Sequence, residues 1–139
     1  MYFIEGRHAK KKIVDQYVNN LMVALKIHRF TARLVNVKFK SVLDDEADGL
    51  CLGDDTEVFV SIGTKDKSFM RQMQALAHEM VHRKQDELGL VKDEIKDGAT
   101  GSPIENQAHA VAGILMRNYG KINKQDAVIA CFNFNFIVL

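Results

Sequence analysis

The stretch ALAHEMVHRKQDELG, residues 75–89, contains the pattern His-Glu-x-x-His, formed by His78, Glu79 and His82. Successive residues of an α-helix are about 100° apart, so the two histidines fall about 40° apart on one face. Both imidazoles can then reach a single cation. Glu79 lies to one side, where its carboxylate can reach a water molecule on that cation. The stretch therefore predicts a metal-binding helix, around which the rest of the fold is expected to form.

The surrounding residues, 66–88, have the periodicity of one long amphipathic helix, which Gly89 is expected to end. Its apolar residues occupy an arc opposite the histidines and suit burial: Phe69, Met70, Met73, Leu76, Ala77, Met80, Val81 and Leu88. The side near the histidines is small or polar, as a metal site requires. The alternative interpretation is a pair of surface histidines on a solvated helix.

A catalytic zinc ion needs a third protein ligand, and this helix does not supply one. The metzincin signature would place a histidine where this chain has Leu88. We therefore expect the ligand from the next predicted helix, residues 103–119, with Ser102 as its N-cap and Pro103 at its first position. Glu105 lies in the first turn of that helix, where a carboxylate is electrostatically favoured. Two histidines and Glu105 would form a His₂Glu set with an open fourth position.

The segments HEMVH and PIENQAHAVAGILM resemble the gluzincin-type metallopeptidases, in particular small ImmA/IrrE-like and phage-type minimal members. In these, the HExxH helix is followed by a helix of the pattern E-x-x-A-(N/H)-x-x-A-x-x-L, and this chain has Glu105, Ala108, His109, Ala112 and Leu115 at those places. LAHEMVH is also similar to SprT-like proteases. Those use a histidine as third ligand and often carry a Cys-rich zinc ribbon, which is absent here. The resemblance covers roughly residues 32–119 and implies a zincin-like fold, Zn²⁺ and peptide hydrolysis.

In such a site Glu79 would be the general base that moves the proton of the attacking water. A second donor to the oxyanion would come from His109 or Tyr119, although His109 could instead be a supporting partner, a competing ligand or a purely structural residue. Three aspartates are candidate acceptors for the ligand histidines: Asp86, Asp93 and Asp97. The partner would be a protein or peptide substrate, which could add as a strand to residues 57–62 if these form an edge strand. The alternative is a strand paired within the sheet.

The order of elements predicts an α+β fold in one domain, residues 1–139, with its core at roughly 32–119, rather than a doubly wound sheet. We expect a small mixed sheet packed against the His-Glu-x-x-His helix and the ligand helix that follows it. We expect a helix at 8–28, strands at 33–42, 50–52 and 56–63, turns or loops at 44–49, 53–55 and 90–102, and a terminal strand at 131–139. The terminal strand carries an alternating row of Phe132, Phe134 and Phe136. This row is expected to complete the core or, alternatively, to dock on a partner subunit.

Composition limits the class of protein. The formal net charge is +1, which gives no reason to expect nucleic-acid binding, and the basic run RHAKKK at 7–12 is typical of a solvated helix start rather than a phosphate site.

Cys51 and Cys131 are expected to be reduced, although a disulfide between them stays an alternative. No apolar run has membrane-spanning length and no signal peptide is evident, so we expect a cytoplasmic protein. Residues 4–7, Ile-Glu-Gly-Arg, match a linker used for tag removal, and we assign them no function.

Two functional hypotheses follow from the sequence. The first is a zinc endopeptidase that acts on a cytoplasmic protein, of a size found among minimal phage metallopeptidases. The second is a catalytically idle zincin-like module that binds or regulates a protein. The intact Glu79 favours the first, because a binding module has no need for that carboxylate. The sequence leaves the oligomeric state open.

Overall fold

Alternating buried valine and isoleucine residues lie in the two central strands of a four-stranded sheet in the computed structural model, which describes residues 2–27, 33–54 and 56–122. The strands are β1 (Tyr2–Glu5), β2 (Leu34–Lys40), β3 (Gly49–Gly53) and β4 (Glu57–Gly63). Their order across the sheet is β1-β2-β4-β3. β1, β2 and β4 run parallel, and β3 pairs antiparallel with β4, so the sheet is mixed.

One face of the sheet faces the core and the other does not. The strand register places Ile4, Val37, Val60 and Cys51 in a row on the core face, and the side chains of Val37 and Val60 are fully buried. Because side chains alternate along a strand, the next row faces the opposite way. That row contains the exposed side chains of Phe3, Phe59 and Leu52.

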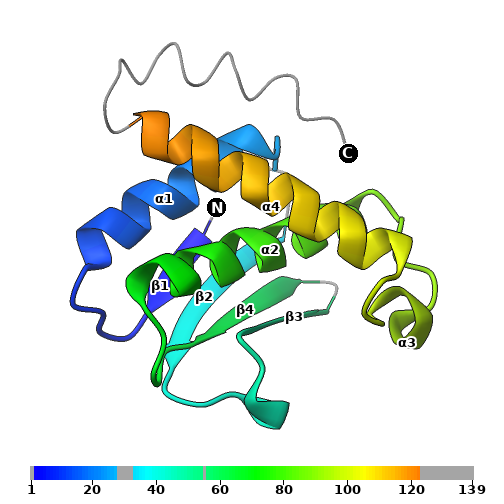
Figure 1. Cartoon of the computed structure of the whole chain (residues 1–139), viewed down its shortest axis with the longest axis horizontal. Coiled ribbons are helices and arrows are strands. Elements are labelled where there is room, and N and C mark those ends of the chain that lie inside the picture. The colour runs from blue at the N-terminus through cyan, green and yellow to red at the C-terminus, as the bar shows by residue number, and fades with distance from the viewer. Residues whose placement is uncertain (1, 28–32, 55, 123–139) are drawn as a thin grey trace.

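The long helices lie over the core face of the sheet, and the shortest one packs beside the last of them (Figure 1). The helices are α1 (Lys11–Ala24), α2 (Phe69–Glu87), α3 (Glu94–Asp97) and α4 (Pro103–Ile122), and a short 3-10 helix occupies Asp44–Glu46. α2 contacts β3 and β4 on one side and α4 on another. α2 begins at its N-cap Ser68, whose hydroxyl accepts the Arg71 N–H, and Gly89, with a φ of +71°, follows its end as expected.

The expectation of a small single domain with mixed α and β elements is confirmed, and so is the mixed sheet packed against the helix of the His-Glu-x-x-His pattern. α1 occupies the middle of the helix expected at 8–28. α3 lies inside the expected connection 90–102. The terminal strand expected at 131–139, with Cys131, lies outside the described residues. Among the described helices, none is long and apolar enough to cross a membrane.

One element was not expected. Strand β1 includes two of the residues that match a linker and to which no function was assigned; Ile4 packs into the core, which stabilises a strand of only four residues. Residues 57–62 are not an edge strand, because β3 pairs along the other side of β4, so the alternative of a strand paired within the sheet is confirmed. α4 also continues past Gly120 to Ile122, since one glycine costs a helix only about 1 kcal/mol.

Candidate metal centre

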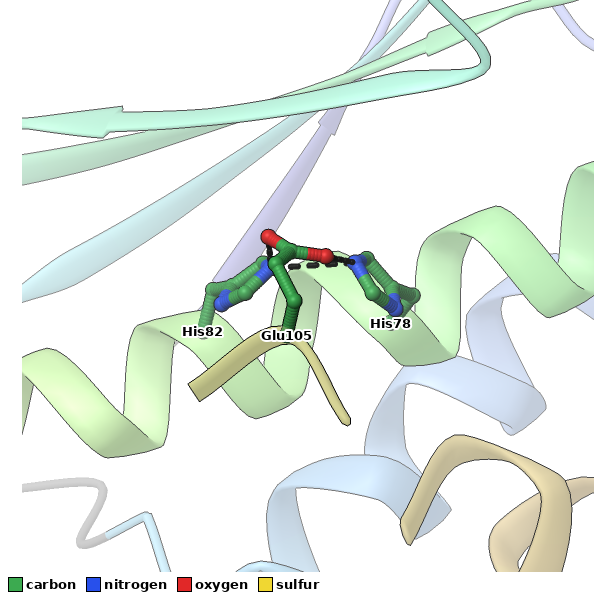
Figure 2. Close-up of side chains that lie close together, drawn as sticks. All are labelled: His78, His82 and Glu105. Carbon is green, nitrogen blue, oxygen red and sulfur yellow. Dashed lines mark hydrogen bonds and ion pairs between the residues drawn. The ribbon is translucent and has the colours of Figure 1, made fainter. Parts of the chain in front are cut away.

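Three side chains from two helices converge beside the sheet (Figure 2). His78 and His82 come from α2, and Glu105 comes from the first turn of α4. Glu105 Oε2 lies 3.2 Å from His78 Nε2, and Glu105 Oε1 lies 2.9 Å from His82 Nε2. The two Nε2 atoms are 3.0 Å apart. The residues expected from the sequence as ligands are thus brought together, with one carboxylate facing both imidazoles.

Local structure at the start of α4 places Glu105. The Ser102 hydroxyl accepts the Glu105 N–H at 3.1 Å and donates to the Asp97 carbonyl at 2.6 Å. Serine caps α4 as the sequence predicts, with Pro103 at the first helical position. Ala108 and Ala112 are buried against the core, and their small side chains let α4 approach α2 closely. The first turn is therefore held near the two histidines.

The donor set suits a zinc ion. Two imidazole nitrogens and one carboxylate oxygen lie within 4.8 Å of one another, and ligand atoms about 2.1 Å from a tetrahedral ion would be about 3.4 Å apart. The three side chains are between 14% and 18% exposed, so they are shielded but open to a ligand. Acidic side chains on a protein surface are common without a bound ion. The Glu105 carboxylate differs from these, because it is mostly buried against two imidazoles.

Electrostatics favour a neutral His78. Burial and the neighbouring His82 lower the pKa of His78 to about 4, against the opposing effect of Glu105. At neutral pH this imidazole therefore has a lone pair available for a cation. Its Nδ1 atom is buried without a hydrogen-bond partner.

Glu79 lies beside the cluster with its side chain under strand β3. It is only 7% exposed. Burial, reinforced by the Glu105 carboxylate, raises its pKa to about 8. Gly49 of β3 makes room for it, because a Cβ atom at Gly49 would lie 2.7 Å from Glu79 Cγ. Glu79 thus lies next to the group formed by His78, His82 and Glu105 and is not a member of it.

The two candidates for an oxyanion donor lie in different places. His109 is at the rim: its side chain is 70% exposed, its Nε2 is 3.8 Å from Glu105 Oε2, and its ring packs on His78 with centroids 4.3 Å apart. Tyr119 packs against Tyr17 of α1 at a centroid distance of 4.6 Å. Because it follows Glu105 by fourteen residues, it lies about 21 Å further along α4. His109 is near the site and Tyr119 is not.

None of the three aspartates expected to support the histidines does so. Asp86 pairs with Arg33, while Asp93 and Asp97 accept backbone N–H groups around α3. The partner of His82 is Gln85, whose Oε1 lies 2.8 Å from His82 Nδ1. The signal for Gln85 was its spacing: seven residues after His78, it falls about 20° from that histidine on the helix.

The outer edge of strand β3 lies next to this cluster, and none of the described strands pairs with it. The Gly63 N–H donates to the Asp48 carbonyl, and the Asp54 N–H donates to the Glu57 carbonyl. Backbone bonds alternate along an antiparallel pair, so Leu50 and Leu52 bond to β4. The backbone groups of the intervening residues, Gly49, Cys51 and Gly53, therefore point away from β4, and no described strand pairs with them.

No family model, no curated protein and no solved structure matches the chain. The residues of the site and their geometry therefore carry the functional assignment.

Proposed function

We propose that the chain is a zinc-dependent peptidase that cleaves a protein substrate in the cytoplasm, with His78, His82 and Glu105 as the metal ligands. One observation carries the proposal. A carboxylate from α4 reaches the Nε2 atoms of two histidines on α2, while a separate buried carboxylate lies beside them. This is the division of roles that zinc hydrolysis requires: a ligand set with an open position, and a base that is not a ligand.

A bound zinc ion would supply Lewis acidity, lowering the pKa of a water molecule towards about 7 and polarising the scissile carbonyl. Glu79 accepts the proton of the attacking water and delivers it to the leaving amine. Its raised pKa, about 8, lies near neutral pH, where a carboxyl group can both take up and release a proton. His109, at the rim with an exposed ring, donates to the developing oxyanion.

The outer edge of β3, with which no described strand pairs, receives the substrate. An extended peptide that adds to an open sheet edge bonds to it through backbone groups, which provides affinity without fixing a sequence. Gly49, Cys51 and Gly53 offer such groups, and Gly49 lies directly over Glu79. A peptide on this edge would therefore pass close to the proton acceptor. β3 is a strand at the edge of the described sheet. We therefore propose β3, in place of residues 57–62, as the strand to which a substrate peptide adds.

The decisive variant is Glu79→Gln, which keeps the shape of the side chain and removes its basicity. We expect it to retain bound zinc and to lose cleavage of a denatured, fluorescently labelled casein by about 100-fold or more. Glu46→Gln, at an exposed carboxylate, is the matched control and should cleave normally. Cleavage by Glu79→Gln at the wild-type rate would refute the mechanism. A wild-type protein that holds zinc and cleaves nothing would favour the idle binding module.

A further inference from the structure

Gln85 is a glutamine with no solvent exposure at the interface of α2 and α4. A buried amide is costly unless its groups are hydrogen-bonded, and here they are. Its Oε1 lies 2.8 Å from His82 Nδ1. Its Nε2 lies 3.0 Å from the carbonyl oxygen of Ile104 and 2.8 Å from Gln107 Oε1. One side chain thus connects one proposed ligand with the turn that carries another.

These contacts determine where the protons are. The carbonyl of Ile104 can only accept a hydrogen bond, so the group that faces it must be the NH₂ of Gln85. The Gln85 oxygen must then face His82 Nδ1, and an oxygen of an amide can only accept. His82 therefore carries its proton on Nδ1 when neutral. The lone pair lies on Nε2, the atom 2.9 Å from Glu105 Oε1, which is the tautomer a metal ligand at Nε2 needs.

The NH₂ group of the Gln85 side chain binds α4. Ile104 immediately precedes Glu105, and Gln107 lies two residues after it. The two bonds from the Gln85 NH₂ group hold both sides of the Glu105 position against α2. The remaining ligand differs, because His78 Nδ1 is buried without a partner. Among the three ligands, His82 and Glu105 are therefore the two whose placement depends on Gln85.

We propose that Gln85 is the positioning residue of the zinc site, an inference that rests on the proposed function. Gln85 sets the tautomer of His82 and the approach of Glu105. It thereby prepares two of the three proposed ligands for the ion. Outer partners of ligand histidines typically change metal affinity by about 10–100-fold. Gln85 acts on two ligands at once, so we expect an effect near the upper end of that range.

The test compares Gln85→Met, which has similar size and no hydrogen-bonding amide, with Gln85→Glu, which keeps an acceptor for His82 and loses the NH₂ group. Zinc affinity is measured by competition with a chromophoric chelator. The tautomer of His82 is read from long-range ¹H–¹⁵N spectra of the metal-free protein, which needs neither zinc nor activity. Leu76→Ala, at a fully buried residue of the same helix, controls for general loss of stability.

We expect Gln85→Met to bind zinc about 100-fold more weakly and to lose the Nδ1–H preference of His82. Gln85→Glu should keep that tautomer and show an intermediate affinity, and Leu76→Ala should lower the melting temperature without changing zinc affinity. Wild-type affinity in Gln85→Met, or an Nε2–H tautomer in the wild-type protein, would overturn the role of Gln85 alone. A wild-type protein without zinc affinity would overturn the proposed function, and the role of Gln85 in it.

Discussion

Glu79 and Gly49 form a contact on which the proposed chemistry depends. The Glu79 carboxyl fits under β3 only because residue 49 has no side chain; an added Cβ would lie 2.7 Å from Glu79 Cγ and 2.9 Å from Glu79 Oε1. Both contacts are too short for real atoms, so one of the two residues would have to move. The glycine therefore determines the position of the proton acceptor.

We predict that Gly49→Ala lowers peptidase activity by about 10-fold or more while zinc affinity stays near wild type, since a displacement of about 1 Å can cost 100-fold in rate. Steady-state cleavage and chelator competition measure the two quantities. Gly113→Ala, where no atom lies within 4 Å of the added Cβ, is the control and should be fully active. Full activity in Gly49→Ala would show that Glu79 does not need this position.

Glu79 also gives the metal-free protein a pH-dependent stability. Burial, reinforced by Glu105, raises its pKa from 4.5 to about 8. The folded protein then keeps a proton that the unfolded chain has released, so stability falls as pH rises through this window. Burial lowers the pKa of His78 from 6.5 to about 4, which makes stability rise with pH, but only up to about pH 6.5.

Of these two groups, only Glu79 therefore changes the free energy of unfolding between pH 6.5 and 8. We predict that the free energy of unfolding of the metal-free protein falls there by up to about 1.4 kcal/mol per pH unit. Urea unfolding at both ends of the window measures it. Glu79→Gln carries no titrating group at this position and should show a flatter profile. Identical slopes for the two proteins would contradict the assignment.

At the scale of elements, Tyr17 joins three helices. Its hydroxyl oxygen lies 3.2 Å from the Met73 carbonyl oxygen on α2 and 2.7 Å from Met116 Sδ on α4, and its side chain is only 1% exposed. α1 has no direct part in the candidate site. It contributes by holding α2 and α4 together at the end away from the metal ligands.

We predict that Tyr17→Phe lowers the free energy of unfolding by about 1–3 kcal/mol, because the variant lacks the one buried O–H that the Met73 carbonyl and Met116 Sδ share as a donor. Tyr2→Phe is the control: Tyr2 donates to Asp15 at an exposed position and should cost less than the buried bond. Chemical denaturation measures both variants. Equal losses of unfolding free energy in the two variants would contradict the role of Tyr17 in joining α1, α2 and α4.

The elements that sequence patterns predict best here are those with several agreeing signals. α2 combines an apolar arc with an N-cap and a terminal glycine, and α4 begins with serine and proline. The order of the strands was not predictable in the same way. Alternation in residues 57–62 shows a strand with a buried face, but it carries no information about which strands flank it. Only the pairing of β3 with β4 decides that β4 is internal.

At the scale of the whole molecule, the candidate site depends on how two distant helices meet. The spacing of His78 and His82 predicts that they share a helix face, and the structure places them side by side. The place of Glu105 at a helix start favours it as the third ligand, and the structure brings it to both histidines. Helical spacing places Gln85 on the face of the two histidines, but its contacts with α4 depend on tertiary packing, which local periodicity does not determine.

In the proposed function, the packing of α4 against α2 creates a zinc site. The most direct test is the zinc content and zinc affinity of chelator-free wild-type protein, with Glu105→Ala beside it and Asn106→Ala, at an exposed neighbour in the same turn, as control. We predict one zinc per chain in the wild type and the control. In Glu105→Ala we predict an affinity reduced by more than the roughly 100-fold that loss of an outer partner can cost. Absence of zinc from the wild type, with no uptake when zinc is offered, would contradict the account, as would unchanged affinity in Glu105→Ala.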